Sequence, residues 1–122
     1  ADAAEVPLCL LTEDMQNRRI VNALFAEAGA VARPTVETNS ISTLFAHARE
    51  GAWSSVMAHT WLHLFGVPEG MRAIPLVEPS ATRSIGLVWV DRDPEPLGVR
   101  ALLEVAAGLD LERALADERA VA

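Results

Sequence analysis

The chain has 122 residues, of which 51% are hydrophobic and 22% are charged, and its formal net charge at pH 7 is −7. This length fits one compact domain, and the apolar fraction is too high for a disordered chain. The acidic balance argues against direct binding to nucleic acid, because the phosphate backbone supplies most of that affinity and repels a negatively charged protein.

Residues 6–11 (VPLCLL) form an apolar run with no polar alternation. Such a run predicts a strand that is covered on both faces, as in parallel sheets. It contains the single cysteine, Cys9, for which we expect a buried, reduced thiol. No apolar run approaches the roughly 20 residues of a membrane span, and the first residues carry no basic segment of the kind that begins a signal peptide.

The following segment predicts a helix that ends at Gly29. Thr12 is a suitable N-cap, and Glu13 and Asp14 would then lie in the first turn, where the helix dipole favours acids. The apolar stripe at helical spacing consists of Ile20, Val21, Leu24, Phe25 and Ala28. Arg18 and Arg19 fall on the polar side. We expect a solvated face there, with an acidic residue of a partner subunit as the alternative.

The rest of the chain continues to alternate strand and helix patterns. The predicted strands are residues 35–38, 53–57, 71–77 and 84–91, with Pro75 favouring an edge position for the third of these. The predicted helices are residues 41–48, ended by Gly51, residues 60–65, ended by Gly66, and a last helix opened by Pro96. The charged tail, residues 110–122, is compatible with a helix that frays. This order predicts an α/β fold with a mixed, mostly parallel sheet flanked by helices.

Ligands of such sheets bind beyond the carboxyl ends of the strands, at helix N-termini. The candidate ligand-binding residues are therefore Thr12, Thr38, Asn39, Ser40, Ser42, Met57 and His59. The free N–H groups of a helix start suit an anion, and the residues 38–42 are the first choice. The plain alternative is that Asn39 or Ser40 only caps its own helix. For Thr12 capping is favoured, since the neighbouring acids repel an anion. For His59 an ordinary surface or core histidine is favoured.

Three stretches resemble the effector-binding (substrate-binding) domain of LysR-type transcriptional regulators. They are PLCLLTEDMQNRRIVNALFAEAG, VETNSISTLFAHAREGAWSSVM and, after AIPLVEP, SIGLVWVDRDPEPLGVRALLEVA. The resemblance implies a periplasmic-binding-protein-like (type 2) subdomain over residues 5–91 and a returning helical segment over residues 92–122. Two departures are Ala52–Ser55 in place of a glycine-rich stretch and Ala58 in place of a proline.

The resemblance also implies a function: a bacterial, cytoplasmic regulator that binds a small, often anionic metabolite in a cleft between two subdomains. The winged helix-turn-helix that contacts promoter DNA, and the first half of the effector domain, have no counterpart in these 122 residues. We expect a homo-oligomer through the effector domain, no enzyme activity, no cofactor, no metal site and no membrane partner. His59 and His63 have metal-ligand spacing but no evident third ligand. The alternative functions are a solute-binding protein of a transport system with the same fold and a small α/β enzyme.

Overall fold

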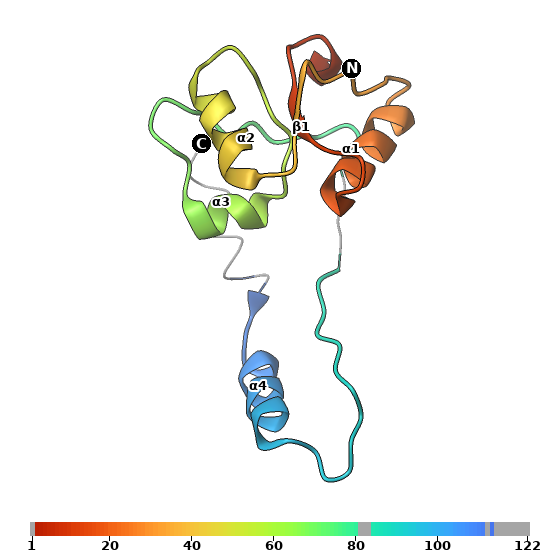
Figure 1. Ribbon diagram of the computed structural model, residues 1–122, viewed down its shortest axis with the longest axis vertical. Helices are drawn as coiled ribbons and strands as arrows, with labels where there is room; N and C mark the ends of the chain where they lie inside the picture. The colour runs from red at the N-terminus through yellow and green to blue at the C-terminus, as the bar shows by residue number, and fades with distance from the viewer. Residues whose placement is uncertain (1, 81–83, 112, 114–122) are drawn as a thin grey trace. The chain divides into compact units, whose positions relative to one another are not determined.

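A computed structural model of the chain describes residues 2–80, 84–111 and 113 (Figure 1). The chain divides between residues 81 and 82 into two compact units. A 3₁₀ turn, Asp2–Ala4, opens the first unit. In the described part of the chain, no helix has the length and apolar character to cross a membrane.

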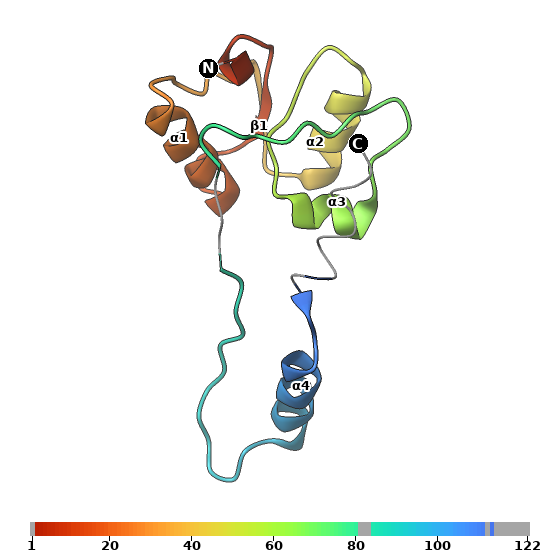
Figure 2. The ribbon, with the colours of Figure 1, turned by 180° about the vertical axis from the view of Figure 1, so that it is seen from behind.

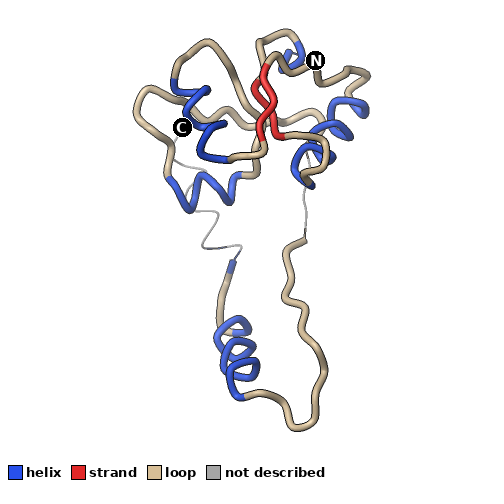
Figure 3. The backbone as a smooth tube through the Cα atoms, viewed as in Figure 1, coloured by secondary structure: helices blue, strands red, loops and turns tan. Residues whose placement is uncertain are grey.

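The first unit is built on a parallel sheet of two short strands, β1 (Cys9–Leu11) and β2 (Val36–Thr38) (Figure 3). Cys9 pairs with Val36, and Leu11 pairs with Thr38. On the other side of β1, Leu8 forms a single parallel bridge with Ser54. The parallel sheet is as predicted, whereas the strand expected at residues 53–57 is reduced to that bridge.

Two helices cover the two faces of β1, as the apolar run predicts. In Figures 1 and 2 the strand lies between α1 (Gln16–Glu27) and α2 (Ile41–Arg49). The cluster on the α1 side consists of Leu8, Leu10, Val21 and Phe25. The cluster on the α2 side consists of Cys9, Leu11 and Leu44. Alternate residues of the strand thus enter opposite clusters, and each buried leucine contributes about 1.5–3 kcal/mol of transfer free energy.

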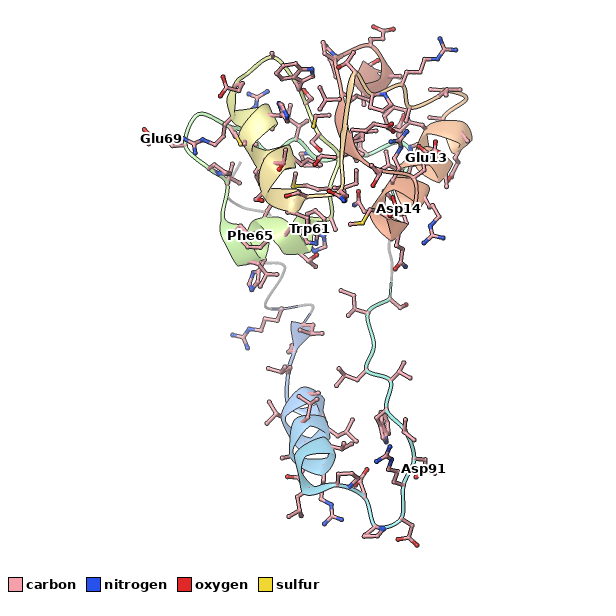
Figure 4. The ribbon with its side chains drawn as sticks, viewed as in Figure 1. Glu13, Asp14, Trp61, Phe65, Glu69 and Asp91 are labelled. Carbon is pink, nitrogen blue, oxygen red and sulfur yellow. The ribbon has the colours of Figure 1, made fainter. Side chains whose placement is uncertain are left out.

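The start of α1 differs from the prediction. The backbone N–H of Thr12 donates to the carbonyl oxygen of Thr38 at 3.0 Å, as part of the pairing of Leu11 with Thr38, and a turn separates Thr12 from the start of the helix. Glu13 and Asp14 then lie in a turn between β1 and α1 (Figure 4). The helix begins at Gln16, and Met15 occupies the N-cap without a side-chain hydrogen bond. The predicted N-cap role of Thr12 is therefore wrong.

The start of α2 and the ends of the helices follow the sequence more closely. Ser40 caps α2, because its Oγ accepts a hydrogen bond from the backbone N–H of Thr43. The short helix α3 (His59–Phe65) begins one residue before the predicted start. It ends at Gly66, whose φ of +68° lies in the left-handed region that favours glycine.

The second unit contains α4 (Leu97–Ala107), which follows Pro96 as predicted. The strands predicted at residues 71–77 and 84–91 are wrong, since neither segment is a strand in the structure. Both are apolar, but a strand needs a hydrogen-bonded neighbour, and Val88 is 98% exposed. Of the tail after residue 110, only Leu111 and Arg113 lie within the described residues.

Candidate functional site

The carboxyl ends of β1 and β2 bring Thr12 and Thr38 side by side. The backbone hydrogen bond from Thr12 to Thr38 joins the ends of the two strands. The Oγ1 atom of Thr38 accepts a hydrogen bond from the backbone N–H of Ser40 at 3.1 Å. Thr38 therefore fixes the short connection between the end of β2 and the start of α2.

The first turn of α2 presents a small group of polar side chains. The Oγ atoms of Ser40 and Ser42 are hydrogen-bonded at 2.9 Å. Asn39 and Ser42 are exposed, and Ser40 and Thr38 are half-buried. The first N–H groups of a helix have no partner inside the helix, and its N-terminus carries a partial positive charge. This arrangement can donate hydrogen bonds to a carboxylate or another small anion.

The hydroxyl of Thr12 has an unused hydrogen-bonding capacity. Its Oγ1 atom is buried and has no hydrogen-bond partner among the described residues. Buried polar atoms normally have a partner, so an exception calls for an explanation. Because Thr12 does not cap α1, its hydroxyl at the carboxyl end of β1 is available for a hydrogen bond to a ligand.

Met57 and His59 relate to this edge in different ways. Met57 packs against the cluster of Cys9, Leu11 and Leu44, so it borders the α2 side of β1. His59 is the first residue of α3 and is exposed. Within the described residues it has no hydrogen bond to Thr12, Thr38 or Ser40. The structure thus connects Thr12, Thr38, Ser40 and Ser42, places Met57 in the adjacent wall, and leaves His59 unconnected.

Arg18 is a buried charge that the sequence did not lead us to expect at this edge. It is 3% exposed, so the predicted solvated position is wrong. Its Nη1 atom donates to the carbonyl oxygen of Leu11 at 2.8 Å and to the carboxylate of Glu37. Arg18 thus pairs with an acid of its own chain. One signal was available, because strand alternation places Glu37 on the face opposite Val36, toward α1.

Comparison with known protein families gives one match. A family described as "LysR substrate binding domain" matches residues 1–109. The chain belongs to this family. The LysR domain has a periplasmic-binding-protein-like fold and is the effector-binding part of a transcriptional regulator. No match is found among curated proteins or among solved structures.

The charges around the edge of this LysR domain are mixed. Arg18 also lies 3.8 Å from the carboxylate of Glu13, whose side chain is 77% exposed. Arg19, which is exposed, donates to the backbone oxygen of Asp14. The anion-compatible part of the edge is thus the start of α2, which has no acidic residue in its first turn.

Two further expectations concern Cys9 and metal ligands. Cys9 is fully buried, as predicted, and burial raises the pKa of its thiol above the ordinary value. In the described ranges, no group of three His, Cys, Asp or Glu side chains is arranged to hold a metal ion.

Proposed function

We propose that this LysR domain senses a small anionic metabolite at the carboxyl edge of β1 and β2 and the first turn of α2. The observation that carries the proposal is the hydrogen-bonded series from Thr12 through Thr38 and Ser40 to Ser42. It groups three hydroxyls at a helix N-terminus, next to the buried, unpartnered hydroxyl of Thr12. Asn39 adds an exposed amide to the same turn.

The proposed ligand lies in a cleft between this subdomain, residues 5–91, and the first subdomain of the regulator. The segment 92–122 then returns to pack on that first subdomain. The exposed apolar residues of the second unit support such a packing surface, since apolar patches of this kind usually meet another protein surface. Within the segment 92–122, the most exposed of them are Leu97, Val105 and Leu109.

The regulator acts in the cytoplasm as a homo-oligomer and contacts promoter DNA through a winged helix-turn-helix outside residues 1–122. The net charge of −7 supports the assignment of DNA binding to a part of the regulator outside these residues. A surface of that charge gains nothing from the phosphate backbone, so DNA affinity belongs to another part of the protein. This domain then alters DNA binding through its ligand and its subunit contacts.

The test is Ser42→Ala in the full-length protein, with Ser54→Ala as the matched control. Ser42 is exposed and does not cap α2, whereas Ser54 is an exposed serine at the opposite, amino edge of the sheet. Acetate, succinate, benzoate and sulfate are titrated, and anion affinity and DNA binding are measured.

We expect Ser42→Ala to weaken binding of the anion that binds the wild type, by about tenfold for one lost charge-assisted hydrogen bond, while DNA affinity without the anion is unchanged. Ser54→Ala should match the wild type. Equal anion affinity in all three proteins would contradict the proposed site.

A further inference from the structure

Arg18 is the buried charged residue of the described chain, and its surroundings are specific. Burying a guanidinium is costly unless its N–H groups are bonded and its charge is paired. Arg18 meets both conditions with partners that lie at most 19 residues away in the sequence. Its Nε donates to Oδ1 of Asn22 at 2.8 Å, one turn along α1. Its Nη1 reaches the carbonyl oxygen of Leu11 and the carboxylate of Glu37.

The two groups that accept hydrogen bonds from Nη1 belong to residues that directly precede a threonine at the end of a strand. Leu11 directly precedes Thr12 at the end of β1, and Glu37 directly precedes Thr38 at the end of β2. One guanidinium on α1 therefore holds the residue before each threonine of the candidate edge. The backbone hydrogen bond between Thr12 and Thr38 lies immediately beyond these two anchors.

We propose that Arg18 is a positioning residue, which holds the ends of β1 and β2 together and so orients the Thr12 and Thr38 side chains for the effector. The part that concerns the effector rests on the function proposed above. The planar guanidinium is suited to this role, because its fixed N–H directions serve three acceptors at once. A lysine keeps the charge but loses that geometry.

Hydrogen exchange of backbone amides in the full-length protein separates positioning from general stability. The Thr12 N–H bonds to Thr38 at the carboxyl edge, and the Cys9 N–H bonds to the carbonyl oxygen of Ser54, 2.9 Å away at the amino edge. In Arg18→Lys we expect exchange at Thr12 to accelerate about tenfold more than at Cys9, because the loss is local. Equal acceleration at both amides would assign Arg18 to fold stability alone and overturn the proposal.

Glu37→Gln provides a second variant in case Arg18→Lys does not fold. The glutamine keeps an oxygen that accepts from Nη1 but removes the carboxylate charge. We expect a smaller acceleration, again selective for Thr12 over Cys9. A variant that leaves both amides unchanged would show that the ion pair does not hold the edge.

The effector part is tested by a double-mutant cycle of Arg18→Lys with Thr12→Val, using the four anions named above as probes. If Arg18 acts through Thr12, Arg18→Lys weakens anion binding in the wild type but has much less effect in Thr12→Val. Additive losses would overturn the proposed route through Thr12. If Thr12→Val and Ser42→Ala both leave anion affinity unchanged, the proposed anion site fails, while the exchange data still decide whether Arg18 holds the edge.

Discussion

The Oγ atoms of Ser40 and Ser42 lie 2.9 Å apart, yet only Ser40 caps the helix that follows. The hydroxyl of Ser40 accepts a hydrogen bond from the backbone N–H of Thr43. The backbone N–H of Ser40 donates to the hydroxyl of Thr38. Ser42 is exposed and has the Ser40 hydroxyl as its bonded partner. Two neighbouring serines thus have separable roles, one in folding and one in the proposed ligand site.

We therefore expect Ser40→Ala to lower the free energy of unfolding by about 1 kcal/mol, the usual cost of losing an N-cap. Ser42→Ala should change it by less than about 0.5 kcal/mol, as for other exposed positions. Urea denaturation of the two variants measures the difference. Equal losses in both variants would contradict the assignment of the cap to Ser40.

Thr12→Val tests the unpartnered hydroxyl directly. Valine has nearly the same shape, and the Thr12 hydroxyl has no hydrogen bond to lose in the described structure. Removing a buried polar group that lacks a partner should leave stability unchanged or raise it by up to about 1 kcal/mol. Thermal unfolding without added anion provides the measurement. A clear loss of stability would mean that the hydroxyl has a partner in the folded protein.

The α2 side of the core is tested with a pair of leucines on neighbouring helices. Leu44 on α2 is 1% exposed, whereas Leu64 on α3 is 71% exposed. Leu44→Ala should cost about 2–5 kcal/mol through lost transfer free energy and the cavity left behind. Leu64→Ala should cost less than about 0.5 kcal/mol. Comparable losses, measured by urea denaturation, would mean that Leu64 is buried against another surface.

The alkaline pH dependence of stability should come from Cys9. The chain has one cysteine, no tyrosine and no lysine, so Cys9 is its side chain with an ordinary pKa in the mildly alkaline range. Burial raises its pKa in the native state. Above the ordinary thiol pKa the unfolded chain loses this proton while the native chain keeps it. Stability therefore falls as pH rises, by at most about 1.4 kcal/mol per pH unit.

Urea denaturation of residues 1–122 between pH 7 and 10 measures this dependence, with Cys9→Ala as the control. The variant lacks the thiol, so its stability should be lower at neutral pH but flat across the alkaline range. The same alkaline decline in both proteins would assign the effect to another group, such as the terminal amine.

Local patterns predicted the elements whose partners lie close in the sequence. The apolar run at residues 6–11 indicated a strand covered on both faces because alternate residues in it are equally apolar. The polar start at Ser40 and the glycine at 66 marked helix ends because capping and left-handed backbone are local requirements. In the structure, four of the seven candidate residues, Thr12, Thr38, Ser40 and Ser42, form one hydrogen-bonded series.

The errors concern features that depend on distant partners. Thr12 does not cap α1, because its backbone N–H is bonded to Thr38, 26 residues later, at the end of the strand pairing, and a turn separates Thr12 from the start of the helix at Gln16. The burial of Arg18 depends on Glu37, 19 residues away. A helical wheel shows Arg18 only as polar. The apolar segment 84–91 satisfies the composition of a strand, but composition does not supply the neighbour that a strand must pair with.

Trp53 is an intrinsic fluorescent probe of this domain. Its indole Nε1 donates to Oγ1 of Thr35 at 3.0 Å, and that hydroxyl donates to the carbonyl oxygen of Leu8. The ring of His47 on α2 packs edge to face against the indole of Trp53, with the ring centroids 5.2 Å apart. Indole emission depends on such contacts, so with Trp61 and Trp89 replaced by phenylalanine, the fluorescence of Trp53 reports whether the amino edge of the sheet and α2 stay together.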